Sequence, residues 1–100
     1  MQDISIYNKY LSYEFGRLKI EKIFLDNIAM QYGTPTFCYS VNQIKDNLNN
    51  LNNSFSKIKP LICYAMKANF NKEIIKIMSK NNLGVDVVSK GELKKSLDCG

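Results

Sequence analysis

The chain has 100 residues, of which 45% are apolar and 23% are charged, a composition typical of a globular protein rather than a disordered tail. This length allows one small domain or part of a larger one, and the absence of histidine excludes Ser-His and Cys-His nucleophile pairs and His-containing zinc sites from these residues. The longest apolar run, residues 61–66, is too short to cross a membrane, and residues 1–13 lack a secretory pattern, so we expect a cytoplasmic protein.

The net charge of +5 is typical of proteins that bind nucleic acid or anionic membranes, but the kind of basic residue argues against both partners. All fourteen basic residues except Arg17 are lysines, and they are dispersed, with Lys94-Lys95 the only adjacent pair. Surfaces that bind nucleic acid usually combine clustered basic residues with aromatic side chains that stack on bases. An AT-rich genome, which over-supplies Lys, Asn and Ile, explains the charge, and we expect neither nucleic acid nor membrane as a partner.

The first forty residues predict two short elements. Residues 17–21 alternate apolar and polar side chains, which is typical of a half-exposed strand, and residues 25–32 predict a helix. Gly33-Thr34-Pro35 ends this helix, because proline cannot continue it and the residue before proline favours an extended backbone.

From residue 36 onward the sequence predicts strands and helices in alternation. Residues 36–39 form a short β-prone run, and Ser40 can cap the next helix, with Gln43 completing a capping-box pattern. One face of this helix is apolar at helical spacing: Ile44, Leu48, Leu51 and Phe55. Pro60 marks a break, and residues 61–65 are apolar on both faces, as a strand in a buried parallel sheet requires.

A second helix is expected in the seventies. Asn69 or Asn71 can cap it, and asparagine at 81 and 82 can end it, because asparagine tolerates the left-handed backbone conformation. Its apolar side chains fall on one side: Ile74, Ile75, Ile77 and Met78.

The last strand and helix follow at once. Residues 84–88 predict a strand, and Ser89 with Glu92 forms a capping box that opens a helix. We expect Leu93 and Leu97 to point inward from this helix and Gly100 to close it.

The three cysteines lie far apart and form no CxxC motif. Cys38 and Cys63 lie inside apolar, strand-like runs, where a reduced cysteine behaves as a small hydrophobic side chain. We therefore expect buried, reduced thiols rather than a disulfide, with Cys99 as the odd third thiol.

This repetition of strand and helix predicts an α/β fold with a parallel sheet. Three units neither close a (β/α)₈ barrel, which takes about 250 residues, nor cover the faces of the sheet. We therefore expect the sequence to be the beginning of a larger protein.

Two residues are candidates for chemistry, because sites in parallel α/β folds lie beyond the carboxyl ends of strands. Lys67 follows an apolar strand and has small alanine neighbours. If partly desolvated there, it is a usable amine nucleophile, whereas a strand-end lysine more often extends to solvent. Asp86 lies in a β-branched run, where a carboxylate needs a partner, so it either approaches Lys67 or forms a structural salt bridge. Capping fully explains Ser89 and Glu92, and there is no GxGxxG phosphate loop.

Three blocks make the sequence similar to a known family: Tyr-Gly-Thr-Pro at 32–35, Tyr-Ala-Met-Lys-Ala-Asn at 64–69, and Val-Asp-Val-Val-Ser-Lys-Gly-Glu-Leu at 85–93. From about residue 13 to residue 100 the chain resembles the N-terminal part of the diaminopimelate decarboxylases, pyridoxal-phosphate enzymes of the alanine-racemase/ornithine-decarboxylase fold type. Two positions depart from the family pattern, since Asn82 replaces a usual glycine and Lys90 replaces a common glycine.

The resemblance implies a fold, a cofactor and a reaction. Residues 43–100 would be the first βα units of a truncated (β/α)₈ TIM barrel that binds pyridoxal 5'-phosphate, and residues 1–42 would contribute to a separate β domain. Lys67 would hold the cofactor covalently and Asp86 would orient it. A homodimer would convert meso-2,6-diaminopimelate to L-lysine and CO₂ in lysine biosynthesis.

Alternatives remain open within and outside the family. The resemblance implies that the phosphate-binding, ring-stacking and substrate-selecting residues lie beyond Gly100, so the substrate could instead be ornithine, arginine or carboxynorspermidine. For the same reason we expect the 100-residue chain alone to be inactive. A small basic α/β module that binds RNA through its lysines is the alternative of another class, and the dispersed lysines argue against it.

Overall fold

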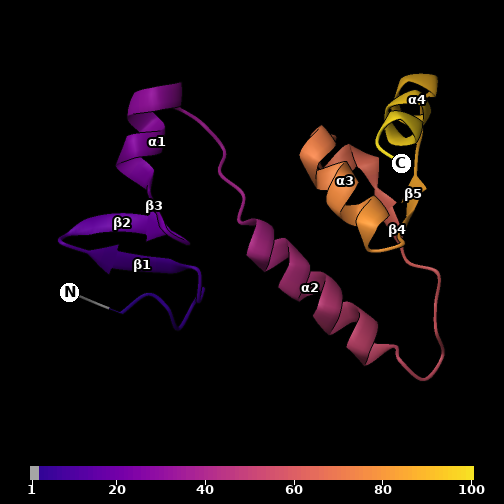
Figure 1. Ribbon diagram of the computed structural model, residues 1–100, viewed down its shortest axis with the longest axis horizontal. Helices are drawn as coiled ribbons and strands as arrows, with labels where there is room; N and C mark the ends of the chain where they lie inside the picture. The colour runs from indigo at the N-terminus through magenta and orange to yellow at the C-terminus, as the bar shows by residue number, and fades with distance from the viewer. Residues whose placement is uncertain (1–2) are drawn as a thin grey trace. The chain divides into compact units, whose positions relative to one another are not determined.

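The computed structural model describes residues 3–100, and the chain divides into two compact units, Met1–Asn47 and Leu48–Gly100 (Figure 1). The division falls within helix α2 (Val41–Ser54), so α2 begins in the first unit and ends in the second. The predicted boundary between residues 42 and 43, with a β-domain segment before it and barrel units after it, stays a prediction.

The first unit is built on a small antiparallel sheet followed by a helix. Strands β1 (Leu11–Glu14), β2 (Arg17–Ile20) and β3 (Ile23–Phe24) lie in the order β1-β2-β3, and helix α1 (Leu25–Tyr32) follows without a gap. Phe15 and Gly16 form the two-residue turn of the first hairpin with φ of 50° and 73°, a backbone that glycine favours. The predicted strand at 17–21 and helix at 25–32 are therefore confirmed, while β1 and β3 were not predicted.

An ion pair joins this sheet to α1. The Arg17 guanidinium donates to both carboxylate oxygens of Asp26, at 2.6 and 2.7 Å, and its carbon lies 4.0 Å from the centre of the Phe24 ring. The hydrogen bond from Arg17 holds the pKa of the Asp26 carboxyl below its usual value. Two charge-assisted bonds in parallel fix this geometry more firmly than a single contact.

The predicted strand at residues 36–39 is wrong. In the described part of the chain these residues belong to no strand, the peptide before Pro35 is cis, and the Phe37 side chain is 90% exposed. A strand needs a neighbour whose backbone exchanges hydrogen bonds with it, and none of the strands within residues 3–100 pairs with this segment. Propensity alone could not reveal that missing neighbour.

Helix α2 begins with the predicted serine cap and an unpredicted second partner. The Ser40 hydroxyl oxygen accepts from the Gln43 backbone N–H at 3.0 Å, as the capping box requires. The Gln43 side chain does not complete the box but donates to Asn47 at 2.9 Å. Glu21 replaces it, accepting from the Ser40 hydroxyl at 2.6 Å and from the Asn42 N–H at 3.1 Å. These bonds, led by the one from Ser40, lower the pKa of Glu21.

The second unit contains the parallel strand pair that the sequence predicted. Strands β4 (Cys63–Ala65) and β5 (Gly84–Asp86) pair in parallel, with Cys63 opposite Gly84 and Ala65 opposite Asp86. Both strands are shorter than expected. Gly84 permits the close approach, because a Cβ at that position would lie 2.9 Å from the Cys63 sulfur.

Helices α3 (Lys72–Lys80) and α4 (Lys90–Asp98) follow the two strands. Asn71 is the cap of α3, since its side-chain oxygen accepts from the Glu73 N–H at 2.9 Å, and Asn82 adopts the predicted left-handed conformation with φ of 60°. The apolar face of α3 is buried as expected. Within residues 3–100 the buried apolar side chains are Leu48, Met66, Ile74, Ile75 and Met78.

On α2 the predicted burial is confirmed for Leu48, whereas the predicted burial of other residues of α2 and of the apolar face of α4 is wrong. Leu93 and Leu97 of α4 do not point into a core, and Leu97 is 72% exposed. Leu51 and Phe55 are also exposed, as are the thiols of the two cysteines that were expected to be buried, Cys38 and Cys63. A two-stranded sheet has too little surface to cover three helices, so within residues 3–100 much of the apolar face of α2 and of α4 stays exposed.

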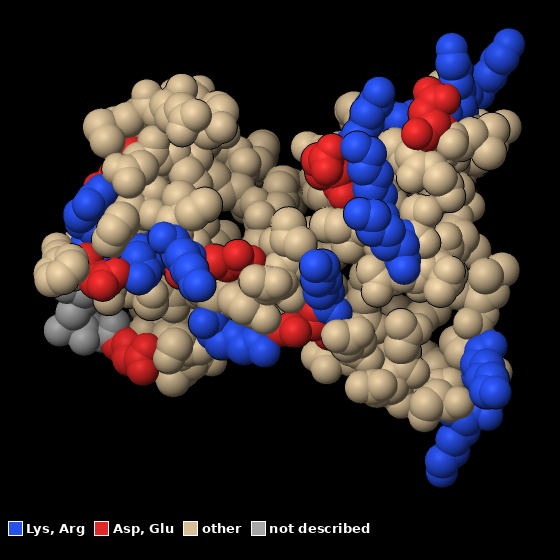
Figure 2. Space-filling view, viewed as in Figure 1, with Lys and Arg blue, Asp and Glu red and all other residues tan. Residues whose placement is uncertain are grey.

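Charged side chains lie on the surface of both units (Figure 2). Lys72, Lys76 and Lys80 recur every four residues and therefore share one side of α3. Acidic side chains lie beside basic ones on the face shown, and Lys76 pairs with Glu73 at 3.0 Å. Among the helices of residues 3–100, none is long and apolar enough to cross a membrane.

Candidate functional site

Lys67 occupies the turn that directly follows β4. The turn is a single 3₁₀ segment, Met66–Ala68, preceded by Ala65 in an extended conformation. The Met66 side chain is completely buried at 0% exposure, whereas Lys67 is exposed. Within residues 3–100 Lys67 is therefore open to solvent, and its role in chemistry stays a prediction. Its amine is accessible, with small alanine side chains around it.

Asp86 lies at the same edge of the parallel pair. It is the last residue of β5 and stands opposite Ala65, two residues before Lys67. The shared sheet therefore brings an amine and a carboxylate to one edge. Asp86 is exposed, and no ion pair with Lys67 or any other residue in the 3–100 range engages it, so the salt bridge expected as its alternative role is not formed there.

The turn that carries Lys67 is held at both ends. The Tyr64 hydroxyl donates to the backbone carbonyl of Asn69 at 2.6 Å, which closes the segment between them. The Asn69 side-chain oxygen accepts from the Asn71 N–H at 3.0 Å, which connects the turn to the cap of α3. Tyr64 belongs to the second of the three family blocks, but no role was predicted for it, because the sequence pattern does not indicate where its hydroxyl points.

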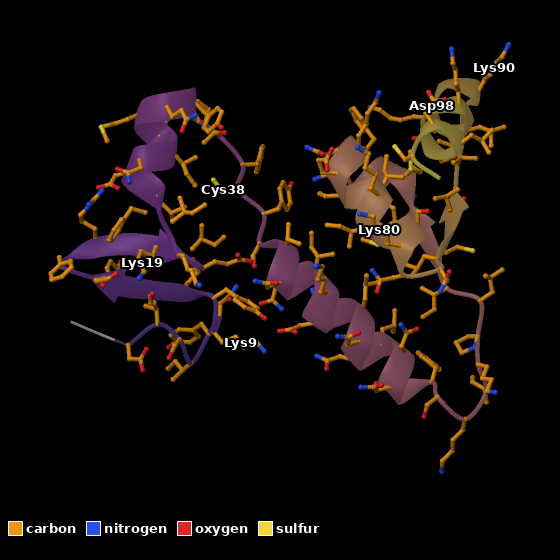
Figure 3. The ribbon with its side chains drawn as sticks, viewed as in Figure 1. Lys9, Lys19, Cys38, Lys80, Lys90 and Asp98 are labelled. Atoms are coloured by element: carbon orange, nitrogen blue, oxygen red, sulfur yellow. The ribbon has the colours of Figure 1, made fainter. Side chains whose placement is uncertain are left out.

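Ser89 and Glu92 act as a helix cap, as predicted. The Ser89 hydroxyl oxygen accepts from the Glu92 N–H at 3.1 Å, and the Glu92 carboxylate accepts from the Val88 N–H at 2.7 Å. Lys90, at the start of α4, is exposed, and its side chain is directed away from the ribbon (Figure 3).

The residues at this edge suit a pyridoxal group in part. An aldehyde-bearing pyridine cofactor needs an accessible primary amine and a carboxylate near its ring, and Lys67 and Asp86 supply both. The small side chains of Ala65 and Ala68 leave room for a flat ring. Gly84 lies in strand β5 and packs against Cys63, so it is not part of a phosphate-binding loop. Residues 3–100 therefore contribute the amine and the carboxylate of such a site, without a glycine-rich loop to bind the phosphate.

A second polar cluster lies in the first unit. Asp46 accepts from the Tyr10 hydroxyl at 2.5 Å and pairs with the Lys9 ammonium at 2.6 Å. Lys9 and, less strongly, Tyr10 lower the pKa of the Asp46 carboxyl. This cluster joins the N-terminal segment to the first turns of α2, and its three groups satisfy one another. Residues 3–100 hold no group of three or more His, Cys, Asp or Glu side chains that could bind a metal ion.

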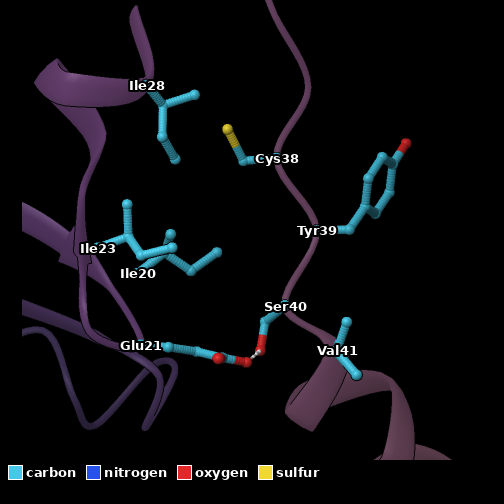
Figure 4. Close-up of a pocket in the computed structure, with 8 residues that line it drawn as sticks. All are labelled: Ile20, Glu21, Ile23, Ile28, Cys38, Tyr39, Ser40 and Val41. Atoms are coloured by element: carbon cyan, nitrogen blue, oxygen red, sulfur yellow. Dashed lines mark hydrogen bonds between the residues drawn. The ribbon is translucent and has the colours of Figure 1, made fainter. Parts of the chain in front are cut away.

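A pocket of about 290 Å³ also lies in the first unit (Figure 4). Its apolar side is formed by Ile20, Ile23 and Ile28, and its rim carries the hydrogen-bonded pair Glu21 and Ser40. The Cys38 sulfur points toward Ile28, while the Tyr39 ring points away. The sequence did not indicate this pocket, which arises from the irregular segment where a strand was expected.

The chain is similar to curated diaminopimelate decarboxylases. The chain is 42% identical to the diaminopimelate decarboxylase of Aquifex aeolicus over 93 residues, which is 93% of this chain and 22% of that protein. It is 37% identical to the diaminopimelate decarboxylase of Vibrio cholerae over 92 residues, 91% of this chain and 22% of that protein. The chain thus spans about a fifth of the length of these relatives.

Solved structures give the same result. A crystal structure from Aquifex aeolicus superimposes with a TM-score of 0.88 at 40% identity, covering 97% of this chain and 24% of that one. Diaminopimelate decarboxylase from M. jannaschii, in co-complex with L-lysine, superimposes with a TM-score of 0.83 at 33% identity, covering 92% and 23%. These matches confirm the predicted α/β fold.

The family match covers the part of the chain that carries both candidate residues. Residues 41–100 match the family described as pyridoxal-dependent decarboxylase, pyridoxal binding domain. This match includes β4, the Lys67 turn and β5, and it extends over more than half of the chain. The chain therefore belongs to the pyridoxal-dependent decarboxylase family.

Proposed function

We propose that the complete protein carrying this chain decarboxylates meso-2,6-diaminopimelate to L-lysine and CO₂, with pyridoxal 5'-phosphate as its cofactor. The observation that carries the proposal is the juxtaposition of Lys67 and Asp86 at one edge of a parallel strand pair, inside the segment that matches the pyridoxal-binding domain. The named relatives support the substrate, since those compared are diaminopimelate decarboxylases and one was solved with L-lysine.

Each of the two residues has a separate task. Lys67 holds the cofactor through its exposed amine, which is the nucleophilic group at this edge. Asp86 orients the cofactor with its carboxylate. When bound, pyridoxal phosphate accepts the electron pair that remains on the substrate as CO₂ leaves. Met66, buried immediately before the lysine, keeps the backbone of the turn in place.

The wider architecture belongs to the same proposal. The two parallel βα units of residues 48–100 would continue into a (β/α)₈ barrel, and the antiparallel sheet of the first unit would join a β domain. A cytoplasmic homodimer completes the proposal. Relatives about four times as long as this chain support the idea of further units, whereas the dimer and the compartment rest on the family resemblance and the sequence.

Three other substrates and one other class of function can be distinguished by experiment. Ornithine, arginine or carboxynorspermidine would be taken by related enzymes of the matched family. An RNA-binding module would use the row of lysines on α3, but Lys76 is already paired with Glu73 and acidic side chains lie beside the basic ones (Figure 2). We therefore favour the decarboxylase.

The test combines a chemical label with turnover. Borohydride reduction of the complete protein with pyridoxal phosphate, followed by peptide mapping, should place the label on Lys67. Lys67→Ala should abolish both the label and CO₂ release from meso-diaminopimelate, while Lys72→Ala, which removes another exposed lysine, should preserve both. Label on a different residue would refute the role of Lys67. Faster CO₂ release from ornithine, arginine or carboxynorspermidine than from meso-diaminopimelate would refute the proposed substrate.

A further inference from the structure

The segment that carries Lys67 is short and is bounded by Met66 and Asn69. Its first residue after β4, Met66, has a side chain with no exposed surface. Its end, Asn69, returns to an extended backbone conformation, with φ of −164° and ψ of 116°. Lys67 and Ala68 between these points are exposed, so packing alone does not determine the conformation of the lysine backbone.

Tyr64 supplies the constraint that packing does not. Side chains alternate along a strand, so Tyr64 projects from the face of β4 opposite to that of Cys63 and Ala65. From there its hydroxyl donates to the Asn69 carbonyl at 2.6 Å, spanning the whole lysine turn. The carbonyl belongs to the backbone, so the bond fixes main-chain geometry rather than one mobile side chain.

The constraint continues into α3. The Asn69 side chain accepts from the Asn71 N–H at 3.0 Å, and the Asn71 side chain accepts from the Glu73 N–H at 2.9 Å. A series of hydrogen bonds therefore runs from the Tyr64 hydroxyl to the first turn of a helix whose inner face is buried. The lysine turn is thereby held between a strand and a helix.

We propose that Tyr64 is a positioning residue for Lys67, acting through its hydrogen bond to the Asn69 carbonyl. This inference rests on the proposed function. The bond limits the backbone freedom of residues 66–69, so the amine is presented at the strand edge in one orientation instead of many. A group that reacts from a fixed orientation loses less entropy than one that must be ordered first.

The test compares two tyrosine variants of the complete protein. Tyr64→Phe keeps the ring and removes the hydroxyl. Tyr13→Phe is the matched control, because Tyr13 lies on β1 and its hydroxyl has no hydrogen bond within residues 3–100. The readouts are the rate at which borohydride-reducible pyridoxal phosphate appears on Lys67 and the amide hydrogen exchange of residues 65–71.

Tyr64→Phe should slow labelling of Lys67 by roughly fivefold, the factor corresponding to one ordinary hydrogen bond, and should speed exchange across the turn. Tyr13→Phe should label at the original rate. If Tyr64→Phe does not fold, amide exchange of the unaltered protein is the second measurement: residues 66–69, closed by the Tyr64 hydroxyl, should exchange more slowly than residues 15 and 16 of the β1–β2 turn.

Different outcomes overturn different statements. Label on a residue other than Lys67 in the unaltered protein overturns the proposed function together with this inference. Label on Lys67 at equal rates in the unaltered protein and in folded Tyr64→Phe overturns the role of Tyr64 alone. Where Tyr64→Phe does not fold, equally fast exchange of residues 66–69 and of residues 15 and 16 in the unaltered protein has the same consequence.

Discussion

Truncation of Met66 tests whether the buried residue beside the lysine anchors the second unit. Met66→Ala removes a side chain that is 0% exposed, and full burial of a methionine contributes about 1.5–3 kcal/mol before any cavity cost. Truncations of this kind cost about 2–5 kcal/mol in total. The buried apolar set of residues 3–100 is small and can partly collapse around the gap, so we expect a loss near 3 kcal/mol.

Hydrogen exchange of the α3 amides measures this loss of stability within the second unit, which contains Met66. A change of about 3 kcal/mol corresponds to roughly a hundredfold faster exchange where exchange reports the opening equilibrium. Met30→Ala is the matched control, since Met30 lies on α1 and is 79% exposed. Met66→Leu should cost less than about 1.5 kcal/mol because it nearly conserves volume. Equal exchange rates in Met66→Ala and Met30→Ala would refute the anchoring role.

Three further predictions concern caps and turns. The pKa of Glu21 is lowered in the fold, so this carboxylate stabilises the protein at a pH above its unfolded pKa of about 4.3, and the stabilisation is lost as the pH falls through the folded pKa. In melting curves recorded over a series of pH values, Glu21→Gln should therefore lose less stability on acidification than the unaltered protein. Asn71→Ala should destabilise α3 by about 1 kcal/mol in urea unfolding, whereas Asn53→Ala, on the exposed part of α2, should change little. Asn82→Gly should be tolerated at φ of 60°, but Asn82→Val should lower the melting temperature, and equal melting temperatures would contradict the argument.

The features that the sequence predicted well depend on neighbouring residues in the chain. Ser40 and Ser89 each cap a helix through a residue three positions ahead, and α3 buries the side chains that its own periodicity selected. Such interactions form within one or two turns. A pattern of adjacent letters therefore contains the information that they need.

The predictions that were wrong concern residues whose packing or hydrogen-bonding partners are distant in sequence or are not found within residues 3–100. Residues 36–39 have strand propensity but no strand beside them, and Leu97 has the right spacing but nothing packed over it. Cys63 is exposed for the same reason. The reciprocal partner of Ser40 is Glu21, nineteen residues earlier, and no capping-box pattern extends that far.

The candidate site falls between these two cases. Lys67 and Asp86 were selected as residues at strand ends, and their common edge follows once β4 and β5 pair in parallel. Their roles in chemistry remain predictions. The hydroxyl of Tyr64 could not be assigned from the sequence, because its direction depends on the path of the turn that it closes.

The contact between Gly84 and Cys63 favours one register of β4 and β5 over the others. If β5 slipped by one residue, Val85 would stand opposite Cys63, at the position where even a single Cβ would approach the sulfur to 2.9 Å. The same slip would move Asp86 to the other face and away from the lysine. A residue with no side chain thus fixes the alignment of the two strands, through a contact that lies two residues before the carboxylate of Asp86 and four residues before the amine of Lys67.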